Sequence, residues 1–129
     1  MDTTQLKRIP LFSDASDKEL KRVAQFAETK EFDEGRALVK EGAYSTALIA
    51  IEEGTAEVTR QGKHIADLGP GDVFGEAGML DDTARGATVT ATSWVKLISM
   101  GHFEVKRLKK DAPGVYERIE KLVQERGGG

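Results

Sequence analysis

The spacing of apolar residues changes twice along this chain, and the two changes divide it into three parts. Near the N-terminus apolar residues recur three and four positions apart, as on one face of a helix, at Leu20, Val23, Ala24 and Ala27. Between about residues 29 and 99 the spacing falls to two, and the apolar segments become short and end at glycine. Helical spacing then returns. The pattern predicts helices at both ends and a β-rich middle.

The N-terminal part predicts a short helical turn and then one amphipathic helix. An apolar lead-in of Leu6, Ile9, Leu11 and Phe12 is interrupted by Pro10, which favours a short turn docked on the domain. The sequence Ser16-Asp17-Lys18-Glu19 has the form of a capping box, in which Ser16 and Glu19 exchange hydrogen bonds with backbone amides. We expect a helix to begin there and to run to about Glu28.

The middle part predicts about eight short strands. Residues 47–51 are all apolar, which is typical of a central strand buried on both faces, and Gln61-Gly62 has the length of a two-residue hairpin loop. The other expected strands lie near residues 29–32, 37–39, 55–60, 63–68, 73–74, 87–91 and 95–99. Many short strands at close spacing indicate a small antiparallel β-roll, a jelly-roll-like barrel.

The C-terminal part predicts two helices. Residues 101–110 form the first, with Phe103 and Leu108 expected to face inward, and Asp111-Ala112-Pro113 separates it from the second. The second helix carries an apolar stripe that can close over the mouth of the barrel or simply dock on the domain: Tyr116, Ile119, Leu122 and Val123. The fold class is therefore α+β, with one helix before the β-roll and two after it.

Length and composition fit one domain. The chain has 129 residues, of which 39% are hydrophobic and 32% are charged, and its net charge is −3. We assign residues 1–126 to a single domain and expect the three glycines at 127–129 to form a flexible tail. The charges are interleaved, so no footprint for nucleic acid is visible, and no apolar run approaches the ~20 residues of a membrane span. We expect a cytoplasmic protein.

Enzymatic and metal chemistry find little support. The chain has no cysteine, and its two histidines, His64 and His102, stand alone without a partner at ligand spacing. No nucleophile elbow, Walker loop or dinucleotide fingerprint occurs. The basic cluster Lys106-Arg107 with Lys109-Lys110 fits the solvated C-terminal end of a helix. We expect no metal, no cofactor and no catalysis; a small cupin-like enzyme is the enzyme class that the β-roll leaves open.

The stretch from Phe74 to Val89 carries the strongest chemical signal. Arg85 offers a planar fork that matches one phosphate group, and Gly78-Met79-Leu80 is placed to form a short helix whose N-terminal amides face an anion. Small residues let the backbone approach a ligand closely: Gly75, Ala77, Gly78, Gly86 and Ala87. Glu76 would repel an anion unless it bound a neutral group such as a ribose hydroxyl. The residues favour a cradle for a singly charged phosphodiester.

This stretch resembles the phosphate-binding cassette of the cyclic nucleotide-binding domain family. The matching residues are Phe74-Gly75-Glu76, Leu80 and Arg85-x-Ala87-Thr88-Val89. Outside the cassette, the family's barrel turns are matched by Phe32-x-x-Gly35-x-x-Leu38-x-x-Glu41-Gly42, Ile51-x-x-Gly54 and Leu68-Gly69-Pro70-Gly71-Asp72. The resemblance covers Leu6 to Glu125. The family includes regulatory subunits of cyclic AMP-dependent protein kinase, the catabolite activator protein and cyclic nucleotide-gated channels.

The resemblance implies a role for each cassette residue. Glu76 would accept from the ribose 2′-hydroxyl, Arg85 would pair with the cyclic phosphate, and Thr88 would line the base end of the pocket. Phe74, Gly75, Ala77, Gly86 and Ala87 complete the implied ligand site, with hydrogen bonds from the amides of Gly75, Ala77 and Ala87. Family members that prefer cyclic GMP commonly carry Thr where this chain has Gly86, which favours cyclic AMP.

The implied function is that of a regulatory sensor without catalytic activity. The ligand would order the cassette and draw the C-terminal helix over the pocket, with Tyr116, Ile119, Leu122 or Val123 as the residue that caps the base. The effector would be a domain or protein outside this chain, and the oligomeric state stays open. The alternative is a degenerate member of the family that binds no ligand and serves as an interaction or oligomerisation module.

Overall fold

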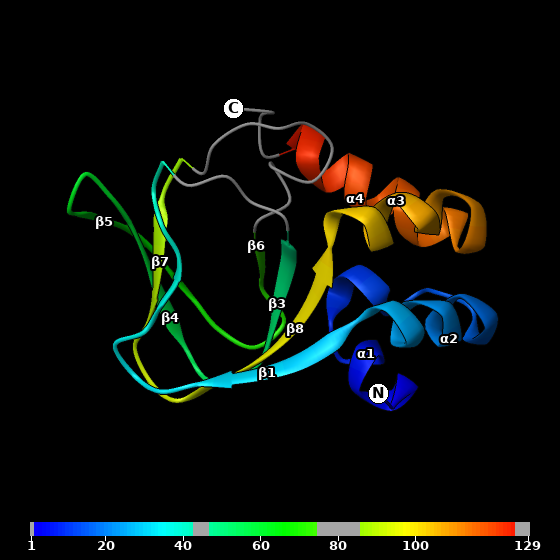
Figure 1. The fold of residues 1–129 in the computed structure, drawn as a ribbon, viewed down its shortest axis with the longest axis horizontal. Coiled ribbons are helices and arrows are strands. Elements are labelled where there is room, and N and C mark those ends of the chain that lie inside the picture. Colours follow the sequence, from blue (N-terminus) through cyan, green and yellow to red (C-terminus); the bar gives the residue numbers. More distant parts are fainter. Residues whose placement is uncertain (1, 43–46, 75–85, 126–129) are drawn as a thin grey trace.

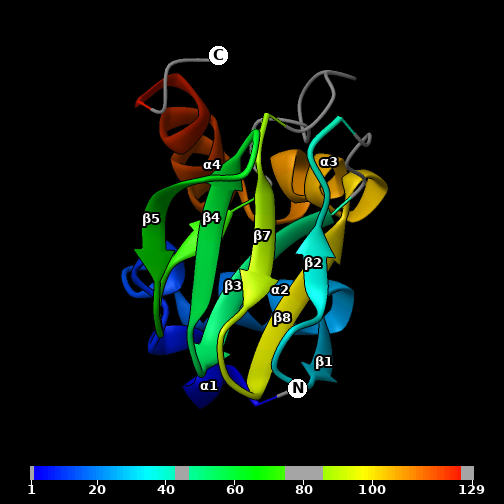
Figure 2. The same cartoon turned by 90° about the vertical axis from the view of Figure 1, so that its left-hand side faces the viewer.

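The computed structural model describes residues 2–42, 47–74 and 86–125. Two four-stranded antiparallel sheets face each other, and all the helices lie against the outer face of one of them (Figure 1). The other sheet forms the opposite side of the molecule (Figure 2). This arrangement confirms the predicted α+β class with an antiparallel β-roll between N-terminal and C-terminal helices.

The element bounds follow the predicted order along the chain. The helical elements are α1 (Thr3–Lys7), the 3-10 helix η1 (Pro10–Phe12), α2 (Asp17–Phe26), α3 (His102–Asp111) and α4 (Pro113–Glu125). The strands are β1 (Glu28–Phe32), β2 (Ala37–Val39), β3 (Ala47–Glu53), β4 (Ala56–Arg60), β5 (Lys63–Leu68), β6 (Val73–Phe74), β7 (Thr88–Ala91) and β8 (Val95–Gly101). The predicted cassette helix at residues 78–80 and the glycine tail lie outside the described residues.

Strand β3 is covered on both faces, as its continuous apolar run predicts. It lies between β8 and β6 in the sheet of order β1-β8-β3-β6. Leu48 and Ala50 face the helices, whereas Ile49 and Ile51 face the second sheet, of order β2-β7-β4-β5. Because side chains of a strand alternate between its two faces, one apolar run contributes to two separate cores.

The two cores have different compositions. Among the described residues, the helix-side core contains 15 buried ones, and its largest side chains are Leu6, Ile9, Phe12, Leu20, Leu108 and Ile119. The core between the sheets is smaller, with Ile49, Ile51, Ala56, Phe74, Val89, Ala91, Val95 and Leu97. The helices therefore rest on one sheet through an apolar layer of their own, and the interior of the β-roll is a second layer.

The β4–β5 hairpin has the predicted two-residue loop. Gln61 and Gly62 have φ angles of 52° and 78°, and positive φ at both central residues matches the right-handed twist of the strands. Gln61 is a non-glycine residue in this region, and its N–H donates to the Glu41 carboxylate at 2.9 Å. A neighbouring turn therefore holds the loop in its uncommon conformation.

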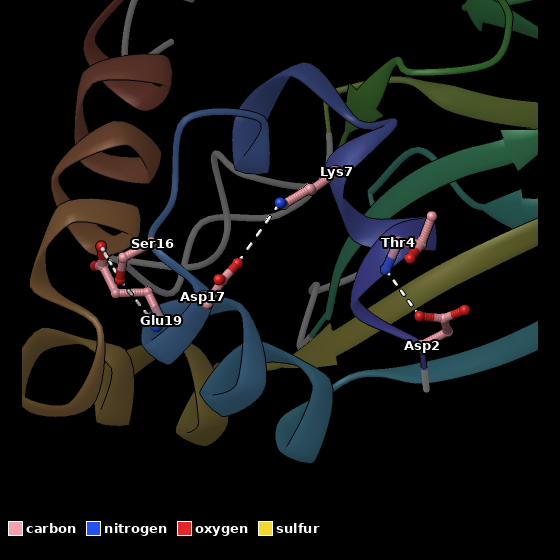
Figure 3. A network of polar contacts seen from close by, with 6 residues as sticks. All are labelled: Asp2, Thr4, Lys7, Ser16, Asp17 and Glu19. Carbon is pink, nitrogen blue, oxygen red and sulfur yellow. Dashed lines mark hydrogen bonds and ion pairs between the residues drawn. The ribbon is translucent and has the colours of Figure 1, made fainter.

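The capping box of α2 is only half formed. Ser16 Oγ accepts the N–H of Glu19 at 3.2 Å, as predicted (Figure 3). The predicted return bond from the Glu19 side chain is wrong, because that carboxylate accepts the N–H groups of Gly114 and Val115 at 2.9 and 3.3 Å. Glu19 thus caps the N-terminus of α4, where free N–H groups and the helix dipole favour a negative charge.

Helix α2 also ends earlier than predicted. Its last residue is Phe26, and Ala27 adopts extended backbone angles that lead directly into β1 at Glu28.

We expect Glu19→Ala to lower the free energy of unfolding by about 1–2 kcal/mol, the usual loss for a helix N-cap. Asp17→Ala is the matched control, because Asp17 lies in the same first turn, has a side chain that is 85% exposed and pairs with Lys7 at 3.5 Å (Figure 3). That pair should contribute a few tenths of a kcal/mol. Urea denaturation of both variants measures the difference, and equal losses would contradict the assigned cap.

Helix α3 presents a different face from the one predicted. Leu108 is buried as expected, but Phe103 is 78% exposed, so its predicted inward orientation is wrong. Residues five apart are separated by about 140° around a helix, so Phe103 and Leu108 cannot share a face. Val105 takes the inward position instead, three residues before Leu108.

No helix in the described part of the chain is long and apolar enough to cross a membrane.

Candidate ligand site

The stretch from Phe74 to Val89 connects the two sheets. Its first residue ends β6 in the sheet next to the helices, and its last residues form β7 in the opposite sheet. The structure describes Phe74 and residues 86–89. The predicted ligand residues Gly75, Glu76, Ala77 and Arg85 lie outside the described residues, and their roles stay predictions.

Hydrogen bonds stabilise the turn at residues 69–72, which precedes β6 and the cassette. The Asp72 carboxylate accepts the N–H of Gly69 at 2.7 Å, and Ile51 exchanges backbone hydrogen bonds with Asp72 and Gly71 at 2.9 and 2.8 Å. Strand β6 follows this turn and pairs with β3. The side chain of Phe74, the last residue of β6, is 6% exposed and packs between the two sheets. Phe74 therefore anchors the start of the cassette in the core; a contact between its ring and a ligand stays a prediction.

The residues that leave the stretch lead into β7, the neighbour of β4. Thr88 lies opposite Thr59 of β4, and Gly86 and Ala87 precede it. Gly86 is exposed, and Ala87 and Thr88 are half-buried. Thr88 Oγ1 accepts the backbone N–H of Glu41 at 2.9 Å. Its oxygen thus accepts from the β2–β3 turn. The place of Thr88 at the base end of a pocket stays a prediction.

Five residues join three segments at this end of the roll, and we call them the rim cluster: Glu41, Arg60, Gln61, Gly86 and Thr88. Glu41 holds both Thr88 and Gln61, through its N–H and its carboxylate. Arg60, the last residue of β4, donates from Nε to the carbonyl of Gly86 at 2.9 Å. The β2–β3 turn, the β4–β5 turn and the start of β7 therefore form one hydrogen-bonded unit beside the cassette.

The stripe of α4 is a docking surface in this structure. Ile119 is completely buried in the helix-side core, and Tyr116 and Leu122 pack against the same core while partly exposed. Val123 lies within α4, but its side chain is not among the described ones. Capping of a base by Ile119 would require α4 to leave this position, so the capping role of these four residues stays a prediction.

Polar contacts fix the first half of α4 to the N-terminal segment. Besides the Glu19 cap, Arg118 donates from Nη1 to the carbonyl of Leu11 at 3.4 Å and pairs through Nη2 with Asp14 at 3.4 Å. Ala112, between α3 and α4, has φ −149° and ψ 67° and is completely buried. This residue is the break predicted at Asp111-Ala112-Pro113, and it sets the angle between the two helices.

One polar side chain away from the cassette, that of Glu52, was not predicted to be buried. Glu52 stands at a bulge of β3, where Glu53 rather than Glu52 pairs with Lys96 of β8, and its side chain is only 5% exposed. It accepts from Gln5 of α1 at 3.1 Å and lies 3.7 Å from Lys96. A bulge re-aims a side chain, and here it gives α1 a polar docking point.

His64 lies on the surface of β5, 3.3 Å from Glu57 and 3.7 Å from Asp67. His102 is the first residue of α3. The two carboxylates approach opposite nitrogens of the His64 ring, and no group of three histidine, aspartate or glutamate side chains among the described residues could hold a metal ion.

Sequence reasoning missed Arg60, Glu41 and Glu19 as organising residues. Each acts through a partner 20 or more positions away in the chain. Their local patterns are an ordinary strand end, a turn and a capping box. For Arg60 the sequence holds no signal of this role, because its relation to Gly86 comes only from the pairing of β4 with β7.

A comparison with family models finds one match, the cyclic nucleotide-binding domain, over residues 29–111. A cAMP-dependent protein kinase regulatory subunit of Yarrowia lipolytica is 36% identical over 105 residues. That alignment covers 80% of this chain but only 28% of the relative. The chain thus corresponds to a little over a quarter of that protein's length.

Solved structures share the fold. The regulatory domain of Toxoplasma gondii PKA, in a co-crystal with cAMP, has a TM-score of 0.83 at 24% identity, covering 95% of this chain and 48% of that one. The regulatory subunit of a cAMP-independent protein kinase A from Trypanosoma brucei has a TM-score of 0.81 at 24% identity, covering 94% and 44%. At such identity these structures support the architecture only. The family match includes the whole stretch from Phe74 to Val89, and the chain belongs to the cyclic nucleotide-binding domain family.

Proposed function

We propose that this chain binds a cyclic nucleotide and acts as a regulatory sensor module. The observation that carries the proposal is the family match over residues 29–111, because it includes a cassette in which both Glu76 and Arg85 are present. A singly charged phosphodiester suits one arginine with nearby amides, and a ribose hydroxyl suits one carboxylate acceptor. The proposal assigns no reaction to the chain.

The described residues on both sides of the cassette support this role. Phe74 fixes its start in the core, and the rim cluster fixes its end. A binding segment between two anchored ends loses less conformational freedom when a ligand binds, which favours affinity. Glu76 would take the ribose 2′-hydroxyl, Arg85 the phosphate, and the amides of Gly75, Ala77 and Ala87 would complete the cradle.

We propose cyclic AMP as the preferred ligand. Gly86 supplies no hydroxyl for the 2-amino group of guanine, so the site gains nothing at that position from guanine over adenine. The Yarrowia lipolytica relative is named for cAMP, and the Toxoplasma gondii neighbour was crystallised with it. Both facts concern those proteins, and they agree with the preference that Gly86 favours.

The response would be a shift of α4. A ligand changes a conformational equilibrium only if it binds one state better than the other. Here Ala112 joins α3 to α4 through a non-helical backbone, so a change at this single residue can reorient α4. Movement of α4 would break the Glu19 and Arg118 contacts and expose Ile119, and the ligand would have to offset those losses. The effector that senses the shift lies outside this chain.

The alternative is a family member that binds no nucleotide and serves as an interaction or oligomerisation module. The Trypanosoma brucei neighbour, described as belonging to a cAMP-independent kinase, is a reason to keep this alternative. The presence of both Glu76 and Arg85 favours binding, because loss of ligand binding removes the constraint on either residue.

Thermal unfolding with added nucleotide separates the two. A ligand at a hundred times its dissociation constant should stabilise the native state by about 2.7 kcal/mol. We expect cyclic AMP to raise the unfolding temperature and 5′-AMP, which lacks the cyclic phosphodiester, to leave it nearly unchanged. An unchanged temperature at millimolar cyclic AMP and cyclic GMP would favour the ligand-free module.

A further inference from the structure

Arg60 lies directly beside the described end of the cassette. It is the last residue of β4 and pairs across the hairpin with Lys63 of β5. On its other side β4 pairs with β7 in a register that places Thr59 opposite Thr88. The antiparallel register therefore puts Arg60 next to Ala87 and diagonal to Gly86, the residue that follows Arg85 in the chain.

The backbone of Arg60 is held in place from the next residue. Gln61 is fixed in a left-handed conformation by its hydrogen bond to the Glu41 carboxylate, and Glu41 is fixed in turn to Thr88. The backbone next to Arg60 is therefore restrained by hydrogen bonds. A long side chain on a rigid base loses less freedom when it forms a specific contact.

The guanidinium of Arg60 lies against Gly86. Its Nε donates to the Gly86 carbonyl at 2.9 Å, and its Nη2 lies 3.7 Å from the position where a Cβ on Gly86 would be, which is an ordinary van der Waals contact. The positive group of a neighbouring strand therefore borders the side of Gly86 from which a side chain would project.

The chemistry of this group differs from that of a hydroxyl. A guanidinium has five N–H donors in a plane and no acceptor, and the bond to Gly86 uses one of them. It therefore pairs with acceptor atoms, such as phosphate oxygens or N7 of a purine, and repels donors such as the 2-amino group of guanine. Its charge also favours an anionic ligand at short range.

We propose that Arg60 is a ligand-binding and specificity-determining residue of this chain: it fixes the end of the cassette through Gly86 and offers its remaining N–H groups to an acceptor atom of the nucleotide. The inference rests on the proposed function. It assigns to β4 a second cationic group at the nucleotide site, in addition to Arg85, beside Gly86.

Titration calorimetry of three variants tests this role. Arg60→Gln removes the charge and keeps a polar side chain, and Arg60→Lys keeps the charge but loses the planar fork. Arg36→Gln is the matched control, because Arg36 follows the β1–β2 turn, where its carbonyl accepts from Ala91 at the opposite end of β7 from Thr88. Unfolding of each variant without nucleotide reports its structural cost.

We expect Arg60→Gln to weaken cyclic AMP binding by about ten- to a hundred-fold, the scale of one hydrogen bond to a charged group. Arg60→Lys should weaken it to a lesser degree, and Arg36→Gln should leave it unchanged. The loss should shrink as salt is raised, because an exposed charge is screened. An equal loss for cyclic AMP and cyclic GMP identifies the phosphate as the acceptor, and an unequal loss identifies the base.

Two results would overturn the inference while leaving the proposed function intact. If the native chain binds cyclic AMP and Arg60→Gln binds it equally well, Arg60 is not part of the site, even where the variant unfolds more easily. If Arg60→Gln and Arg36→Gln weaken binding equally, only the net charge matters. Failure of the native chain itself to bind any cyclic nucleotide would overturn the proposed function, and this inference with it.

Discussion

Arg85→Ala is expected to lower the affinity for cyclic AMP by about thirty- to several-thousand-fold, equivalent to about 2–5 kcal/mol. In the proposed site the fork of Arg85 is the main side-chain partner of the cyclic phosphate. Its removal leaves the ligand's charge opposite the backbone amides and the Arg60 guanidinium. Arg85→Lys should recover only part of the affinity, because a point charge cannot bind two phosphate oxygens in a fixed geometry. Calorimetric titration of each variant measures the change.

The control for this prediction is an arginine outside the site. Arg22→Ala removes a guanidinium from the exposed face of α2, where it donates to Gln25 at 3.2 Å. We expect its dissociation constant to match that of the native chain. A folded Arg85→Ala variant with an unchanged dissociation constant would remove Arg85 from the site, and with it the main chemical reason to regard the cassette as functional.

Gly54→Ala is expected to destabilise the fold by about 4 kcal/mol, the largest stability effect that we predict for a single methyl group. Gly54 has φ +94°, a region that side-chain-bearing residues avoid at a cost of about 1–3 kcal/mol. An added Cβ would also collide with the Trp94 carbonyl oxygen and lie 2.9 Å from Val95 Cγ1. Overpacking adds a further 1–3 kcal/mol or so. Urea denaturation measures the total.

The chain contains a matched control for this substitution. Gly35 has φ +92°, nearly the same backbone conformation, but an added Cβ there meets no atom within 4 Å. Gly35→Ala should therefore show the backbone strain alone, about 1–3 kcal/mol. The difference between the two variants isolates the close approach of the β7–β8 turn to Gly54. Equal losses would mean that the turn yields freely and that this contact does not constrain the fold.

The parts of the fold that could be predicted depend on signals between residues close in the chain. The continuous apolar run at 47–51 predicts a strand with both faces covered. In the structure β3 contributes side chains to the helix-side core from one face and to the core between the sheets from the other. The Gln61-Gly62 loop and the Ser16 cap follow from backbone preferences at one or two residues. In these cases the physical cause and the sequence signal occupy the same few positions.

Predictions failed where the partner lies far away in the chain. The Glu19 carboxylate has two sets of amides within reach, those of its own helix and those of α4, and only the packing of α2 against α4 decides between them.

The error at Phe103 had a local cause. Phe103 lies on the opposite side of α3 from the face that Val105 and Leu108 bury. Counting 100° per residue would have avoided it.

In the candidate site, too, the residues that lie close together in the chain could be predicted and the residue brought in by the fold could not. Small residues, one acid and one arginine indicate a phosphate cradle without any knowledge of the fold, because the chemistry of the ligand requires them within a short segment. Arg60 could not be assigned from its own surroundings, since its relation to Gly86 exists only through the pairing of β4 with β7. Residues that a sheet brings together carry no mark of that proximity in the sequence.

Titration of the native chain with cyclic AMP, cyclic GMP and 5′-AMP is the most direct test of the account. We predict saturable one-to-one binding of cyclic AMP, weaker binding of cyclic GMP, and no measurable binding of 5′-AMP at the same concentrations. Heat signals that do not saturate for either cyclic nucleotide at millimolar concentration would contradict the account and leave the chain as a ligand-free member of its family.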